Sequence, residues 1–104
     1  MKTEQQGAIR LEDGDVLTEE SAEIARIWIT DGAGSSVWIA AHVLEDPTVF
    51  GYLMADTIRH AARAYAGTWS IDERQALQAI VDGVGEQLRD QFGKIETIQE
   101  GKLN

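Results

Sequence analysis

The sequence contains no cysteine and a single proline among its 104 residues. Without cysteine the chain can form no disulfide, no thiolate metal site and no cysteine nucleophile. Its stability must therefore come from one hydrophobic core, which a chain of this length can build with little to spare. A small domain without cysteine fits a reducing compartment, so we expect a cytoplasmic protein.

Basic residues are also scarce, because nine lysines and arginines stand against 18 aspartates and glutamates, a formal net charge of −9. Nucleic-acid affinity rests largely on basic side chains that neutralise phosphates, so we expect no binding to nucleic acid. The same argument applies to anionic lipid surfaces. The sequence has no apolar leader and no apolar run long enough to span a bilayer, so we expect no membrane association.

Two segments rich in β-branched and aromatic residues, 23–30 and 36–44, flank the turn-forming sequence Asp31–Gly34. This pattern predicts an antiparallel β-hairpin. The polar residues 1–21 are expected to form an N-terminal arm, and we expect its first six or so residues to be disordered. The later part of the arm, residues 9–17, could add a third strand.

A first helix is predicted after the hairpin. Asp46 is a favourable N-cap and Pro47 a favourable first helical residue. Apolar residues then recur at spacings of three and four, and this predicted buried stripe comprises Phe50, Leu53, Met54, Ile58, Ala61, Ala62 and Tyr65. Gly67 is placed to end the helix as a C-cap residue.

A second helix is predicted from Ser70, whose hydroxyl, with Glu73 three residues on, fits a capping box. Its apolar stripe comprises Leu77, Ile80, Val81, Val84, Leu88 and Phe92. We expect Gly93 to end this helix. The interior glycines Gly83 and Gly85 each cost about 1 kcal/mol relative to alanine, which suggests that the first helix or a second subunit crosses there.

Together these elements predict one α+β domain over residues 22–93, followed by a tail over 94–104. The antiparallel β-hairpin, with or without a third N-terminal strand, would carry both helices packed on one face. Alternation along the strands puts apolar residues on both hairpin faces in either register, and the helices can cover only one of them. We therefore expect a homodimer, or else an arm that folds back over the second face. The expected contact region comprises Trp28, Trp38 and His42.

Charged residues of the first helix form the candidate ligand-binding site. The solvent-exposed face of this helix is expected to carry Asp56, Arg59, His60 and Arg63. Asp56 lies one turn before His60, where its carboxylate can hold the imidazole ring. The two arginines could bind a carboxylate or a phosphate. A solvated face of ion pairs is the simpler interpretation. We find no catalytic residue, no metal-ligand set and no cofactor motif in the sequence, and assign none.

Three stretches, Arg26–Gly32, Glu45–Gly51 and Leu53–Tyr65, carry a resemblance to a known family. They resemble a small, uncharacterised bacterial family, found in proteobacteria, that is classed as a domain of unknown function. The resemblance extends over residues 22–92 and is most specific at the Asp-Pro helix start and in the Ala-Asp and Arg-His pairs of the first helix. It implies a β-β-α-α fold in a bacterial cytoplasm, and it implies no activity, cofactor or site residue.

The sequence thus favours a homodimeric protein-interaction or structural module, with an unidentified protein partner and without enzymatic activity. The alternative is a domain that binds a small anion, or a small enzyme, using the Asp56, Arg59, His60 and Arg63 face. A third hypothesis is an acidic inhibitor that mimics nucleic acid. The acidic residues argue against it, because they are dispersed along the chain rather than concentrated in one dense run.

Overall fold

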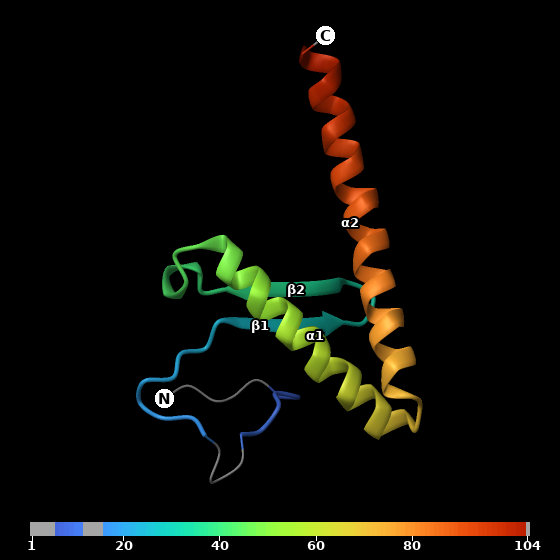
Figure 1. The fold of residues 1–104 in the computed structure, drawn as a ribbon. Helices are drawn as coiled ribbons and strands as arrows, with labels where there is room; N and C mark the ends of the chain where they lie inside the picture. The colour runs from blue at the N-terminus through green and yellow to red at the C-terminus, as the bar shows by residue number, and fades with distance from the viewer. Residues whose placement is uncertain (1–5, 12–15, 104) are drawn as a thin grey trace. The chain divides into compact units, whose positions relative to one another are not determined.

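The computed structural model describes residues 6–11 and 16–103, with side chains described as far as Gly93. The chain forms, in order, β1 (Ala25–Thr30), β2 (Gly34–Ile39), the short 3-10 helix η1 (Ala41–Val43), α1 (Pro47–Trp69) and α2 (Glu73–Leu103) (Figure 1). The predicted α+β arrangement, an antiparallel hairpin followed by two helices, is confirmed. In this described part of the chain, no helix combines the length and the apolar character needed to cross a membrane.

The chain divides into two compact units, Met1–Glu45 and Asp46–Asn104. The first unit contains the hairpin and the second contains the helix pair. The packing of both helices on one hairpin face, and the single domain over 22–93, stay predictions. The predicted disorder of the first six residues falls almost wholly outside the described residues.

The hairpin closes through a three-residue turn that needs glycine. Gly32 and Gly34 have φ angles of 80° and 86°, in the left-handed region that glycine enters without steric cost. The Ala33 N–H donates to the Thr30 carbonyl oxygen at 2.9 Å, so the turn follows directly on the last strand pair. The sheet has two strands, and the described parts of the N-terminal arm add no third.

The register of the hairpin decides which side chains share a face. Ile27 pairs with Val37, and Trp28 pairs with Ser36. Paired residues project to the same side of an antiparallel sheet, so the aliphatic residues of the two strands meet. We call this side the aliphatic face, which comprises Ala25, Ile27, Ile29, Val37 and Ile39, with Ser35 opposite Ile29 at its end. The opposite side is the tryptophan face, which comprises Arg26, Trp28, Thr30, Gly34, Ser36 and Trp38.

The second strand is shorter than predicted, and His42 does not lie on it. β2 ends at Ile39, and the next N–H, that of Ala40, donates to the Ile24 carbonyl oxygen at 2.8 Å. The following residues form η1, in which the Val43 N–H donates to the Ala40 carbonyl oxygen at 3.1 Å. Alanine has a low strand propensity and the chain must turn before α1, so a local 3-10 turn replaces the predicted end of the strand.

α1 begins as predicted but ends later. Asp46 Oδ1 accepts a hydrogen bond from the Thr48 N–H at 2.9 Å, and Pro47 is the first helical residue. The helix continues past Gly67, because this glycine does not take the positive φ of a C-cap residue. Ser70 ends the helix instead, with a φ of 57° in the left-handed region.

The prediction that Ser70 caps the second helix is therefore wrong. Asp72 Oδ2 accepts a hydrogen bond from the Gln75 N–H at 3.1 Å and caps the start of α2. Gly93 does not end this helix either, since α2 continues to Leu103 and most of the predicted tail is helical. A glycine weakens a helix by about 1 kcal/mol, and it ends one readily only where it takes a positive φ, which Gly93 does not.

α1 and α2 pack against each other beside the turn that joins them. Among the side chains that the structure describes, the buried apolar ones are Ala62 and Ala76, at 1% and 4% exposure. Both lie within a short distance of the turn along the sequence, and their small side chains let the helices approach closely. Figure 1 shows the two helices diverging from this turn, so that the far half of α2 runs away from α1.

The interior glycines of α2 do not mark a crossing with α1. Beyond the helix's own backbone, a Cβ at Gly83 would meet nothing within 4 Å, and one at Gly85 would meet only the Arg89 guanidinium, at 3.2 Å. The alternative, a second subunit at this point, stays a prediction.

We expect Gly83→Ala to raise the free energy of unfolding by up to about 1 kcal/mol, because alanine fits the open helix and reduces the entropy of the unfolded chain. Urea unfolding followed by circular dichroism would measure the change. Gly34→Ala is the matched control, and its positive φ predicts a loss of stability instead. A destabilised Gly83→Ala variant would mean that a neighbour approaches this point of α2.

Candidate functional site

The predicted charged site lies along one side of α1. Arg59 and His60 lie three and four residues after Asp56, and Arg63 lies four and three residues after them; all four side chains are exposed, as predicted. The structure brings His60 Nε2 to 3.5 Å from Asp56 Oδ2. Both side chains are mostly in water, so this contact adds little to stability.

An open helix surface limits what these four residues can do. Each arginine carries a fixed positive charge and a fork of N–H donors that suits an oxyanion. Water and salt screen such charges on an exposed face, so their affinity for a small anion would be weak. Among the residues that the structure describes, no group of three histidines, aspartates or glutamates is placed to hold a metal ion.

The predicted contact residues Trp28 and Trp38 come together on the tryptophan face, whereas His42 lies apart on η1. Trp38 pairs with Arg26, and Trp28 pairs with Ser36. The two indole rings are therefore diagonal neighbours across the strands, a separation that aromatic side chains can bridge. Trp28 is half-buried, and Trp38 is 60% exposed.

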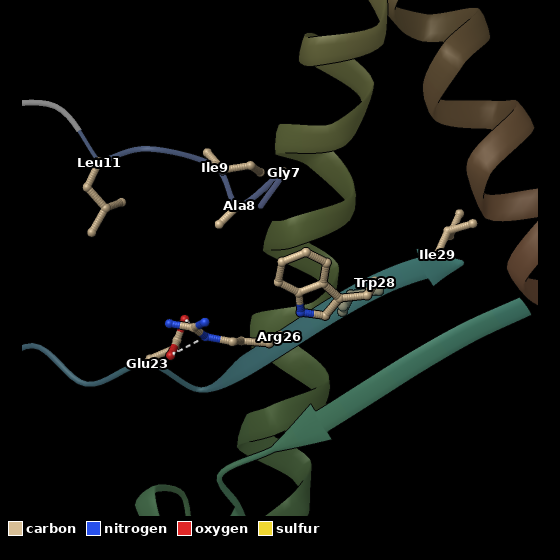
Figure 2. A pocket seen from close by; sticks show the side chains of 9 residues that line it. Gly7, Ala8, Ile9, Leu11, Glu23, Arg26, Trp28 and Ile29 are labelled. Carbon is tan, nitrogen blue, oxygen red and sulfur yellow. Dashed lines mark hydrogen bonds and ion pairs between the residues drawn. The ribbon is translucent and has the colours of Figure 1, made fainter. Parts of the chain in front are cut away.

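An open hollow of about 590 Å³ lies between β1 and the described segment of the N-terminal arm (Figure 2). Arg26 Nε donates to both carboxylate oxygens of Glu23 at 2.9 Å, and Figure 2 shows the Trp28 indole turned toward the arm. The hollow is lined by Gly7, Ala8, Ile9, Leu11, Glu23, Arg26, Ile27, Trp28 and Ile29. Sequence reasoning missed this hollow, because no local pattern shows where an extended arm comes to lie.

The aliphatic face of the hairpin is an exposed apolar surface without a charged side chain. Ile27 is 64% exposed and Ile29 is 84% exposed, and the neighbouring Val37 and Ile39 are exposed as well. Contiguous apolar surface of this kind is typical of sites of protein interaction. The alternation in each strand was visible in the sequence, but only the register brings the two sets together.

The chain matches the family described as Domain of unknown function (DUF5076) over residues 14–91. It is also similar to a solved structure from the photosynthetic bacterium Rhodopseudomonas palustrus CGA009, which is provisionally described as a pyruvate dehydrogenase. The two share 33% identity with a TM-score of 0.59, and the similar region covers 79% of this chain and 82% of that chain. No curated protein matches the chain. Because the family match spans most of the sequence, including nearly all of the stretch that carries the resemblance, the chain belongs to DUF5076, a family of unknown function.

Proposed function

We propose that this protein is a cytoplasmic homodimer that acts as a protein-interaction module and binds its partner through the hairpin. The observation that carries the proposal is the aliphatic face, in which four large aliphatic side chains are exposed on one side of a two-stranded sheet: Ile27, Ile29, Val37 and Ile39. A two-stranded sheet is marginally stable in water and needs a packing layer.

A single chain has one layer that can pack on the hairpin, the helix pair, and this layer cannot cover both faces of the sheet. The helix pair can cover one face, and the other is then available to a second protein. The tryptophan face already carries the Arg26–Glu23 ion pair, whereas the aliphatic face carries no charged side chain that a binding protein would have to neutralise. Ile27 and Ile29 line the hollow beside the arm together with Trp28, yet they stay 64% and 84% exposed. These features favour the aliphatic face as the docking surface.

The tryptophan face, with Trp28 and Trp38 but without His42, is the alternative docking surface. Tryptophan is enriched at binding hot spots, and Trp38 offers a large exposed ring. The pyruvate dehydrogenase description belongs to the similar protein, and the sites described above contain no feature that ties that activity to this chain.

A photo-crosslinking amino acid at position 29 tests the docking face in the cells that make the protein. We expect covalent adducts with another protein from position 29, because Ile29 projects from the aliphatic face. The control replaces Asp31, which lies in the turn and belongs to neither face. Adducts from position 38 instead would move the docking surface to the tryptophan face. Equal labelling from positions 29 and 31 would contradict a specific docking surface.

The homodimer is tested by light scattering coupled to size-exclusion chromatography. The purified chain should be measured over about a hundredfold range of concentration, because a dimer dissociates on dilution. We expect twice the mass of one chain at the higher concentrations. A single-chain mass throughout would show that the protein does not self-associate.

Anion binding on the charged face of α1 is the alternative function, and the two exposed guanidinium groups of Arg59 and Arg63, four residues apart on the helix, favour it. If this function holds, replacing Arg59 and Arg63 together by alanine should abolish phosphate binding, measured by NMR titration. The unfolding transition should stay unchanged, because both side chains are exposed. Arg74→Ala, which removes an exposed arginine of α2, is the matched control. A wild-type chain that shows no phosphate-dependent shifts would eliminate this function.

A further inference from the structure

The apolar stripe of α2 is only partly covered. Near the turn, Leu77 and Ile80 are half-buried, beside the buried Ala76. Further along, Val81 and Leu88 are each 47% exposed, although both belong to the stripe that the periodicity predicts. Figure 1 shows α2 diverging from α1 beyond the turn, so α1 leaves this part of the stripe uncovered.

The stripe, half-buried at Leu77 and exposed from Val81 onward, has the spacing of a coiled coil. Its positions follow one another at intervals of four, three, four and three residues, and we call them the α2 seam: Leu77, Val81, Val84, Leu88 and Gln91. In the sequence the same alternation continues at Ile95 and Ile98, which extends it to three heptads. A mean interval of 3.5 residues keeps such a seam facing one partner helix along its length.

Charge also favours a second copy of this chain along the seam. The chain carries a net charge of −9, so any surface that meets its own copy must keep acidic side chains away. From Leu77 to Gln91 the positions that flank the seam are uncharged: Gln78, Ile80, Gly85, Gln87 and Phe92. The charged residues of this part of α2 lie on its other side: Asp82, Glu86, Arg89 and Asp90. Asp82 Oδ1 also accepts a hydrogen bond from Gln78 Nε2 at 2.8 Å, which holds that carboxylate beside its own helix.

We propose that two copies of this protein pair along the α2 seam as a parallel, in-register coiled coil. The inference rests on the homodimer of the proposed function, and it leaves the hairpin for the partner protein. An uncharged apolar seam complements an identical copy of itself, as a two-fold symmetric interface requires. The parallel arrangement places Gln91 opposite the same residue of the second copy, where the two amides can form a hydrogen bond. An antiparallel arrangement would set this amide against an apolar side chain, at a cost in desolvation.

Single cysteines test the seam cleanly, because the chain has none of its own. Facing seam positions of a parallel coiled coil lie within the separation that a disulfide spans. Under mild oxidation, Val81→Cys and Leu88→Cys should each give a covalent dimer, seen at twice the chain mass on a non-reducing gel. Glu86→Cys, on the outer side of the same helix, is the matched control. We expect the yield of dimer from both seam variants to exceed that of Glu86→Cys by about tenfold or more.

The outcomes separate this inference from the proposed function. A wild-type chain that stays monomeric in light scattering overturns both. A wild-type dimer whose Val81→Cys and Leu88→Cys variants cross-link no better than Glu86→Cys overturns the seam and leaves the homodimer standing. Efficient cross-linking at one seam position alone overturns the parallel register. An intrachain disulfide in Ile29→Cys/Leu88→Cys would show that the chain's own hairpin occupies the seam, which also overturns the inference.

Discussion

Replacing Ala62 by aspartate is expected to unfold the helix pair. Ala62 is buried where α1 packs on α2, so a carboxylate at this position would lose its water without gaining a partner. A buried charge without a partner costs about 3–5 kcal/mol, a large share of the total stability of a small domain. We expect a loss of this size in the free energy of unfolding, or the loss of a cooperative transition, in urea titrations followed by circular dichroism.

Ala64→Asp is the matched control for this substitution. It introduces the same side chain two residues further along α1, at an exposed position. The helix propensity and the helix dipole act almost equally on the two variants, so burial is the main difference between them. We expect Ala64→Asp to change stability by about 0.5 kcal/mol or less. Equal losses in the two variants would mean that the packing of α1 on α2 does not form a core.

Replacing Gly34 by valine should disrupt the hairpin and leave the helix pair folded. Gly34 has a φ of 86°, and a β-branched residue is strained there by about 1–2 kcal/mol or more. A two-stranded hairpin is marginal, so a cost of this size removes much of its stability. Amide hydrogen exchange measured by NMR should show faster exchange at Ala40, whose N–H donates to the Ile24 carbonyl oxygen. Exchange at Ala76, whose N–H donates to the Asp72 carbonyl oxygen within the helix pair, should be unchanged.

Ser35→Val separates backbone strain from the effect of the valine side chain. Ser35 follows Gly34 directly, lies within β2 and pairs with Ile29. Its φ is not positive, and valine is favoured in strands, so this variant should exchange at Ala40 as slowly as the wild type or more slowly. If Ser35→Val loosened the hairpin as much as Gly34→Val, the left-handed turn would not be the cause.

The hairpin and the start of α1 could be predicted because their signals act locally. Gly32 permits a left-handed turn whatever packs around it. Asp46 accepts a hydrogen bond from a backbone N–H two residues away, and Pro47 fits a first helical turn through its own fixed φ. None of these preferences depends on distant residues, so they can be read from the sequence.

The helix ends could not be predicted in the same way. Gly67 and Gly93 both lie inside helices, although each was expected to end one. The preference of glycine is worth about 1 kcal/mol, which continued hydrogen bonding and packing can outweigh. Ser70 shows the converse, since it takes a left-handed conformation despite its Cβ. The capping role that its sequence position predicted passes to Asp72.

The candidate sites were predicted in part. The helical period placed Asp56 and His60 on one side of α1, and the structure brings their side chains to 3.5 Å. The sequence likewise assigned Trp28 and Trp38 to one expected contact region, and the register places both side chains on the same face of the hairpin. His42 does not belong to the strand at all, because the chain leaves the sheet before it.

By itself, the sequence determined the order of the elements, the turn at Gly32 and Gly34, the Asp46 cap and the acidic charge. Each of these follows from a local backbone preference or from composition. Only the tertiary structure decided that the aliphatic residues of both strands share one face, and that the apolar stripe of α2 is uncovered beyond its first turns. Register and coverage depend on contacts between segments far apart in the chain, and a shift of one residue would exchange the faces of the hairpin.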